Sequence, residues 1–391
     1  MGQDRAAADP FQPARLGPLV LRNRFVKAAT FEGMADNGLA SERLVGFHRS
    51  MAAGGVALTT VAYLAVSADG QGAPGEIVLN PATVPGLATL ANAVHDEGAL
   101  VSGQIGHAGP VAAATGRRGL APSRTFSPVA MRVTRAASEQ DLEQVVQDFA
   151  AATTILRQAG LDAVEIHMGH GYLLSSFLSP ALNRRNDRWG GTVENRARLP
   201  RAVAAAVREA AGPDMAVLAK LNMSDGHRSS VTVQDCIEVA RLLEHDGCID
   251  AIELTAGSSF SDPMYLMRGA APVRELAAQF PNPTRAAVRL LGGRFLRTYP
   301  FEEGFLSEPA HAARAGVSLP LVLLGGINHL DTVHSAMRSG FEFVALGRAL
   351  LHEPGIINRW RSGSTAPGGC THCNQCMPTI YSGTRCTLVT P

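Results

Sequence analysis

The stretch from Gly160 to Tyr172 reads Gly-Leu-Asp-Ala-Val-Glu-Ile-His-Met-Gly-His-Gly-Tyr and holds three side chains that can do acid–base chemistry. A short apolar run at 163–166 lies between a Gly-Leu-Asp signal and a glycine-punctuated polar segment, which predicts a buried strand ending there. His167, His170 and Tyr172 follow that strand within six residues. Two imidazoles and a phenol supply hydrogen-bond donors and a proton source, so we predict catalytic and substrate-binding roles for all three.

The histidine pair has two alternative interpretations. A metal site is the first, because His167 and His170 are three residues apart. We expect Glu165 to face the other side of the strand, however, and an open catalytic metal usually takes three protein ligands. A structural place in the core is the second, since histidines are often buried without a chemical role. Hydrogen bonding to a substrate oxygen is the favoured role.

Lys220 and Gln104 also end apolar segments. We predict that the Lys220 ammonium points toward the same site as the two histidines and Tyr172. There it can stabilise an anionic heterocycle or, if desolvated, act as an amine nucleophile. The alternative is a structural ion pair with Glu253 or Asp225. Gln104 offers a donor and an acceptor, which suit an imide-like edge of a ligand.

Two later segments end in Gly325-Gly326 and Gly347-Arg348. Exposed backbone N–H groups and a guanidinium can hold a phosphate, and α/β barrels commonly bind phosphate at this point of the chain. We therefore predict a ligand that carries a phosphate. The alternative is a tight turn followed by a solvated helix start.

Eight strand-like segments, separated by helices or long excursions, position these side chains. Ser41 and Ser138 are predicted caps of two of the helices. This count of eight strands predicts a closed parallel (β/α)8 TIM barrel, with an open doubly wound sheet as the alternative. Every polar candidate then falls at the carboxyl ends of the strands, on one face of the barrel. The predicted strands cover residues 24–30, 55–61, 99–102, 163–166, 215–221, 251–255, 319–324 and 343–346.

The chain divides by pattern into three parts. We expect an N-terminal tail at 1–20, a barrel at 21–362 with an insertion at about 257–318, and a cysteine-containing C-terminal extension at 363–391. The loop at 110–137 is too long for a simple connection, so we expect it to be a lid or a rim of the site.

Composition argues against other classes of function. The 391 residues are 46% hydrophobic and 18% charged, which favours a large buried core over disorder. Lys and Arg number 35 and Asp and Glu 34, so nothing favours nucleic acid or a membrane surface as a partner. No apolar run approaches the ~20 residues of a membrane span, and we expect a soluble, cytoplasmic protein.

The most specific string runs from Glu165 to Arg196. After His-Met-Gly-His-Gly-Tyr-Leu it continues with Phe-Leu-Ser-Pro at 177–180, Asn-Arg-Arg at 183–185, Asp-Arg-Trp-Gly-Gly at 187–191 and Glu-Asn-Arg at 194–196. With these motifs the chain resembles the old yellow enzyme family (NADH:flavin oxidoreductases), most closely the branch of bacterial 2,4-dienoyl-CoA reductase, whose N-terminal barrel it matches. The resemblance covers nearly the whole chain.

The resemblance implies noncovalent FMN over the barrel mouth. The backbone of Ala28, Ala29, Thr30 and Ala62 would lie beside the isoalloxazine, and Gln104 would lie at its pyrimidine edge. The FMN phosphate would be held by Gly325, Gly326, Gly347 and Arg348. His167 and His170 would bind the carbonyl of an α,β-unsaturated substrate, flavin N5 would deliver hydride to the β carbon, and Tyr172 would protonate the α carbon.

Two departures from the family pattern concern the flavin. Lys220 stands where much of the family has an arginine, which keeps the positive charge but loses the bidentate fork, so we expect an altered flavin potential. Ala28-Ala29 replaces a common Pro-Met pair and leaves a less bulky wall.

Four of the six cysteines, Cys370, Cys373, Cys376 and Cys386, crowd the C-terminus. In a large cytosolic chain such clustering favours metal or redox use over disulfides. The spacing is similar to the four-iron cluster motif of the dienoyl-CoA reductase branch, although the third cysteine comes one residue early. An iron–sulfur cluster, a zinc site in which His372 could replace one cysteine, and unmetallated thiols remain three alternatives.

The leading hypothesis is an FMN-dependent oxidoreductase that takes hydride from NADH or NADPH and reduces an activated alkene. One alternative is a non-redox barrel enzyme, an aldolase or isomerase that forms a Schiff base through Lys220. Another is a flavin or iron–sulfur subunit of a larger electron-transfer complex. Assembly into a homo-oligomer is left open.

Overall fold

The computed structural model describes residues 8–114 and 116–389. Eight parallel strands form a closed barrel, because β17 pairs with β3 and β3 pairs in turn with β6. Each predicted strand segment contributes one of them, which confirms the (β/α)8 barrel and excludes the open doubly wound sheet. In order around the barrel the strands are β3 (Phe25–Lys27), β6 (Leu58–Ala65), β8 (Leu100–Gly106), β13 (Ala163–Met168), β14 (Ala216–Asn222), β15 (Ala251–Thr255), β16 (Leu321–Leu323) and β17 (Phe343–Leu346).

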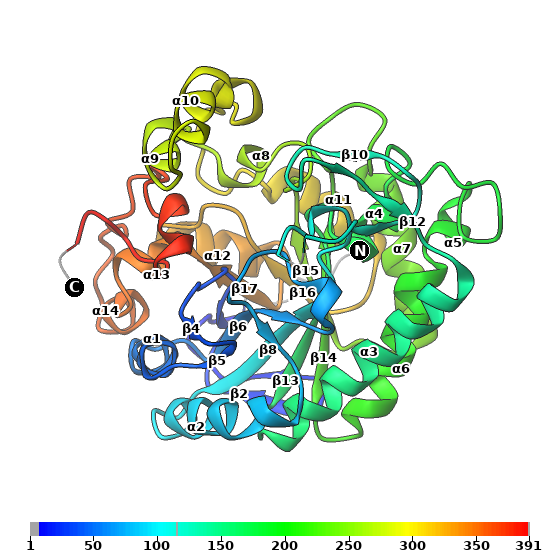
Figure 1. The fold of residues 1–391 in the computed structure, drawn as a ribbon. Coiled ribbons are helices and arrows are strands. Elements are labelled where there is room, and N and C mark those ends of the chain that lie inside the picture. The colour runs from blue at the N-terminus through cyan, green and yellow to red at the C-terminus, as the bar shows by residue number, and fades with distance from the viewer. Residues whose placement is uncertain (1–7, 115, 390–391) are drawn as a thin grey trace.

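Helices cover the outside of the barrel, with α3 and α6 side by side (Figure 1). Both predicted caps are confirmed: the Ser41 side chain begins α1 (Glu42–Ala53), and Ser138 forms a capping box at the start of α3 (Glu139–Gln158). No helix in the described residues has the length and hydropathy that a membrane crossing requires. The other helices on the barrel are α2 (Val84–His95), α4 (Leu173–Leu178), α5 (Val193–Arg196), α6 (Arg198–Ala211), α7 (Val233–Asp246), α11 (Ser307–Gly316), α12 (Leu330–Arg338), α13 (Arg348–His352) and α14 (Ile356–Arg361).

A hairpin covers the end of the barrel opposite the predicted site. β1 (Ala14–Leu16) and β2 (Leu19–Leu21) pair antiparallel, where we expected a tail. Leu16 and Leu21 are buried in one cluster with Leu58. Apolar side chains at the amino-terminal ends of barrel strands would otherwise face water, which explains why this segment folds back over them.

The long connection after β15 contains three helices before the barrel helix α11. They are α8 (Met264–Met267), α9 (Val273–Ala278) and α10 (Thr284–Phe295). In Figure 1, α9 and α10 project from the body next to the C-terminal segment, and the rings of Phe280 and Tyr381 lie 5.9 Å apart across that contact. Because α11 packs on α7 and leads into β16, it belongs to the barrel, whereas we expected the insertion to reach residue 318.

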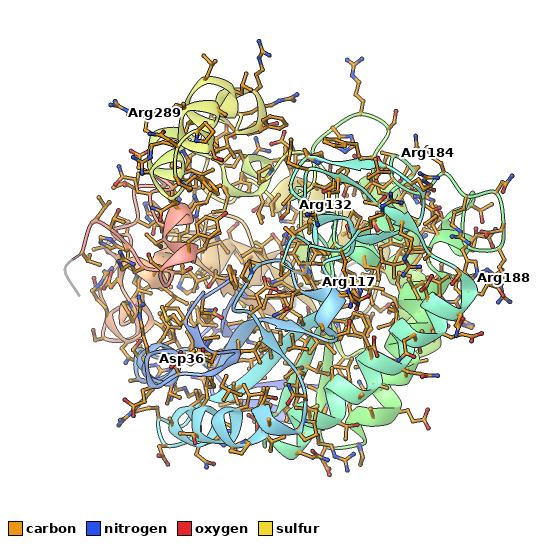
Figure 2. The ribbon with its side chains drawn as sticks, in the orientation of Figure 1. Asp36, Arg117, Arg132, Arg184, Arg188 and Arg289 are labelled. Atoms are coloured by element: carbon orange, nitrogen blue, oxygen red, sulfur yellow. The ribbon has the colours of Figure 1, made fainter. Side chains whose placement is uncertain are left out.

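Short elements fill the remaining loops. The expected lid or rim at 110–137 borders the site through its first residues, because Tyr172 packs against the buried cluster of Val111 and Ala112. Arg117 and Arg132 of this loop are seen in Figure 2 above the barrel strands. The loop elements are β4 (Ala35–Asp36), β5 (Leu39–Ala40), η1 (Ala68–Gly70), β7 (Ile77–Val78), η2 (Pro81–Thr83), η3 (Gly109–Val111), β9 (Leu120–Ala121), β10 (Phe126–Ser127), β11 (Arg132–Val133), β12 (Arg135–Ala136) and η4 (Met377–Tyr381).

Candidate active site

A cavity of about 340 Å³ opens at the carboxyl ends of the barrel strands. Residues far apart in sequence meet there, because in a parallel barrel all strands end on one face. With the exception of Ala62, every residue that we predicted to bind cofactor or substrate lines it. These residues are Ala28, Ala29, Thr30, Gln104, His167, His170, Tyr172, Lys220, Gly325, Gly326, Gly347 and Arg348.

Ala62 is buried and is not among the residues that line this cavity. Its backbone N–H donates to Glu32 Oε2 at 2.8 Å, and Glu32 Oε1 forms a buried ion pair with Lys27 Nζ at 2.5 Å. The next residue, Tyr63, lines the cavity instead. We missed Tyr63 in the sequence, although its place directly after Ala62 near the end of an apolar strand was a signal that could have found it.

Three aromatic side chains predicted from one stretch form a cluster in the cavity. The ring centroid of His167 lies 4.6 Å from that of Tyr172 and 5.0 Å from that of His170. Tyr63 packs edge-on against Tyr172 at 5.3 Å. His170 has a left-handed backbone, with φ of 62°, and its N–H donates to Asn222 Oδ1 at 3.1 Å. The turn after β13 brings His170 and Tyr172 to the same space as His167, which lies within the strand.

Burial keeps all three side chains uncharged. It lowers the pKa of His167 well below its usual value, with the charges of His170 and Lys220 adding to the effect. Burial and then Lys220 lower the pKa of His170 to about 3. Burial and the carboxyl of Glu76 raise the pKa of Tyr172 above its ordinary value of 10.0. At neutral pH the cluster therefore offers neutral hydrogen-bond donors and a protonated phenol.

Lys220 is paired with two carboxylates at the base of the cavity. Its Nζ lies 2.5 Å from Glu253 Oε1 and 3.3 Å from Glu165 Oε1. Our expectation that Glu165 faces away was wrong, because residues two apart share a face of a strand, so Glu165 points inward with His167. Burial alone would lower the pKa of Lys220, but the two carboxylates outweigh it and raise that pKa. A protonated ammonium of this kind is a poor Schiff-base nucleophile.

The predicted phosphate end fits a bound anion. Gly325 and Gly326 have φ of 136° and 70°, and a Cβ on Gly326 would lie 2.6 Å from the ring of Phe301, so only glycine leaves this backbone free to approach a ligand. Arg348 lies beside them, held by the side chain of Asn374. With Gln104 and Lys220 at the opposite end, these residues fit a planar heterocycle that carries a phosphate.

The four C-terminal cysteines line one small cavity of about 20 Å³ with Arg348. Cys386 Sγ lies 3.5 Å from His352 Nδ1, and Cys370 Sγ lies 3.8 Å from His372 Nδ1. Across residues 8–114 and 116–389, however, no three His, Cys, Asp or Glu side chains are grouped so as to hold a metal ion. The described residues therefore show no metal site at Cys370, Cys373, Cys376 and Cys386, and an iron–sulfur cluster or zinc there stays a prediction.

The outer rim of the cavity was not predicted. It is built by apolar side chains of the insertion, such as Leu266 and Met267, and of the C-terminal extension, such as Met377 and Ile380. The insertion follows β15 and the extension follows β17, and no local sequence pattern links either segment to the barrel mouth. Only the tertiary structure brings them over the site.

Comparisons with known proteins identify the family of the chain. The family model described as "NADH:flavin oxidoreductase / NADH oxidase family" matches residues 9–257. The chain is 49% identical to the 4,4'-dithiodibutanoate disulfide reductase of Rhodococcus erythropolis, over 97% of this chain and 94% of that protein. It is 30% identical to a metal reductase of Desulforamulus reducens over 95% of this chain, and it spans 52% of that relative's length.

Solved structures give the same fold. A complex of 2-naphthoyl-CoA reductase superposes with a TM-score of 0.81 at 25% identity, over 97% of this chain and 56% of that chain. The old yellow enzyme homologue from Zymomonas mobilis superposes with a TM-score of 0.72 at 22% identity, over 94% and 96% of the two chains. From the family match and the relative of 49% identity, the chain belongs to the NADH:flavin oxidoreductase / NADH oxidase family, that of old yellow enzyme, and is a flavin-dependent NAD(P)H oxidoreductase acting on a small molecule.

Proposed function

We propose that this chain transfers hydride from NADH or NADPH, by way of bound FMN, to the β carbon of an α,β-unsaturated carbonyl or a related activated alkene. One observation carries the proposal: two neutral imidazoles and a neutral phenol converge on a cavity whose other end fits a phosphate-bearing heterocycle. Cytosolic location accompanies this proposal as a prediction.

The residues that would hold FMN surround the cavity. Gly325, Gly326, Gly347 and Arg348 would bind its phosphate, while Ala28–Thr30 and Gln104 would lie beside its ring system. FMN would supply the hydride when bound. Lys220 would keep a positive charge near the ring, since Glu165 and Glu253 hold it in the protonated form.

The chain's own residues would activate the substrate. His167 and His170 would donate hydrogen bonds to the substrate carbonyl oxygen and so draw electron density from the alkene. Tyr172 would then give its phenolic proton to the α carbon. Its raised pKa keeps the phenol protonated at neutral pH, which a proton donor requires.

Reduction of an organic disulfide is a second candidate. The relative at 49% identity is named as a disulfide reductase, and it matches this chain over nearly its full length. Cleavage of R–S–S–R by one hydride and one proton yields two thiols. Tyr172 would supply that proton to the leaving thiolate, so both candidate reactions use the same acid.

A competition between substrates separates the two candidates. FMN-loaded protein is reduced with NAD(P)H without oxygen and mixed with either a simple cyclic enone or 4,4'-dithiodibutanoate, and flavin reoxidation is followed. Faster reoxidation by the enone supports the alkene, and faster reoxidation by the disulfide supports the second candidate. No reoxidation by either would overturn both.

The earlier alternatives predict different observations. A Schiff-base enzyme would be colourless, release no FMN and be covalently trapped at Lys220 by borohydride with its substrate. A subunit of a larger complex would copurify with a stable partner and show no turnover with NAD(P)H alone.

A further inference from the structure

The Thr255 side chain forms a hydrogen bond with the active-site histidine His170. It ends β15, is fully buried, and places Oγ1 at 2.9 Å from Nε2 of His170. In the described structure this is the one hydrogen bond of the Thr255 side chain. The direction of that bond decides where His170 carries its proton, because a neutral imidazole has a single N–H.

Two directions can be compared. If His170 Nε2–H donated to Thr255, the hydroxyl proton would be buried without an acceptor among the described residues. Leaving a buried donor unsatisfied disfavours that arrangement by about ten- to a hundredfold. The favoured arrangement has the Thr255 hydroxyl donating to Nε2, which leaves the His170 proton on Nδ1.

The His170 ring is also fixed through its backbone. Asn222 Oδ1 accepts from the His170 N–H at 3.1 Å, while Asn222 Nδ2 donates to Asp225 Oδ1 and to the Gly257 carbonyl, both at 2.8 Å. With both amide donors occupied, the Asn222 side chain has one orientation. The backbone contact with Asn222 and the side-chain contact with Thr255 together fix the position of the His170 ring.

His167 has the opposite arrangement. Its Nδ1 is buried and has no partner among the described residues, so a proton there would be unsatisfied. The proton therefore belongs on Nε2. In the described part of the chain, His167 Nε2 and His170 Nδ1 make no hydrogen bond and are not fully buried, so each faces the cavity.

We propose that Thr255 is a positioning residue that fixes His170 as the Nδ1–H tautomer, so that both histidines donate into the cavity at one point. The inference rests on the proposed role of the pair and defines the ligand class more closely. A ligand must present a strong acceptor, such as a carbonyl oxygen or phenolate. A ligand that presents a donor to this point is rejected.

Nitrogen-15 NMR of the FMN-loaded protein, labelled at histidine, tests the tautomer directly. The His170 signals are identified by their absence from the spectrum of His170→Asn. We expect a protonated Nδ1 and an unprotonated Nε2 in the wild type and in Thr255→Ser, which keeps the hydroxyl. In Thr255→Val, which keeps the shape, the hydrogen bond that stabilises the Nδ1–H form is lost, so the Nε2–H form should gain population relative to the wild type. A wild-type His170 protonated at Nε2 would overturn the proposal, and that spectrum is decisive even if Thr255→Val fails to fold.

Binding of a simple phenol, followed by the change in the flavin spectrum, tests the consequence. The dissociation constant should rise severalfold in Thr255→Val and stay near the wild-type value in Thr255→Ser, because the His170 donor to the phenolate is less populated and no longer fixed only in the first. Equal affinity in all three proteins would contradict the positioning role. Absence of phenol binding in a wild type that shows the expected tautomer would instead overturn the proposed role of the histidine pair while supporting the tautomer.

Discussion

The rings of His167 and Tyr172 lie 4.6 Å apart in one cavity, although a strand end and a turn separate them in the chain. A second phenol, Tyr63, packs on Tyr172 but donates its hydroxyl to the Gly70 carbonyl at 3.3 Å. In the described residues the Tyr172 hydroxyl makes no such bond and faces the cavity. Of the two phenols, Tyr172 is the one free to give a proton to a substrate.

Tyr172→Phe should slow substrate reduction by about 10²- to 10⁴-fold, the usual contribution of a positioned acid. Flavin reduction by NAD(P)H should change little, because that half-reaction needs no proton from Tyr172. Stopped-flow measurement of each half-reaction checks this. Tyr63→Phe is the matched control, with a much smaller expected effect. Equal losses in the two half-reactions would remove the role assigned to Tyr172.

Lys220→Met should lower the free energy of unfolding by roughly 3–5 kcal/mol, since it leaves two buried carboxylates without their cation. Urea denaturation of the FMN-loaded protein measures the change. The double variant Lys220→Met with Glu253→Gln should regain part of the loss, because only Glu165 then stays uncompensated. A single variant as stable as the wild type would show that the ion pair is not formed.

Gly326→Ala should weaken FMN binding by tenfold or more. The new Cβ would meet the Phe301 ring at 2.6 Å on a backbone with φ of 70°, so the loop must move away from the phosphate position. FMN released on dilution, measured by its fluorescence, reports the affinity. Gly293→Ala in α10 is the control, because its Cβ meets no atom within 4 Å. Similar affinities for the two variants would place the phosphate elsewhere.

Glu76 should make stability depend on pH. Burial raises the pKa of this carboxyl from 4.5 to about 7, and its Oε2 accepts from the Gly72 N–H at 2.7 Å. Because the folded-state pKa is raised, the stability that Glu76 contributes is present below about pH 4.5 and is lost as the pH rises through 7. The free energy of unfolding falls by about 3 kcal/mol over this range, because a shift of one pKa unit corresponds to about 1.36 kcal/mol.

Between pH 4.5 and pH 8 the free energy of unfolding of Glu76→Gln should therefore fall by about 3 kcal/mol less than that of the wild type. Urea unfolding at both pH values measures this difference. Glu209→Gln, an exposed residue of α6, is the control and should follow the wild type. If the free energy of unfolding had the same pH dependence in Glu76→Gln and the wild type, burial would not shift the pKa of this carboxyl.

Features encoded locally could be predicted from the sequence. The eight strands follow from apolar runs bounded by glycines and polar residues, and the helix starts follow from Ser41 and Ser138. The candidate site residues were found because they stand at or shortly after the ends of such runs. They are His167, His170, Tyr172, Lys220 and the glycines of 325–326 and 347. A barrel then brings those ends together without further information.

Features that depend on tertiary contacts could not be predicted. We predicted the backbone of Ala62 beside the flavin, and we did not predict that its neighbour Tyr63 lines the cavity at a register shift within β6. The inward direction of Glu165, by contrast, could have been predicted, because residues two apart on a strand share a face and His167 points inward. Thr255 carries no motif, and its importance comes from a 2.9 Å contact with a residue 85 positions away.

The absorption spectrum of the purified protein, followed through one reaction cycle without oxygen, tests the central claim most directly. The account predicts a yellow protein that releases FMN on denaturation, is bleached by NADH or NADPH, and regains its colour when an activated alkene or an organic disulfide is added. A colourless protein without FMN, or a flavin that NAD(P)H does not bleach, would contradict it.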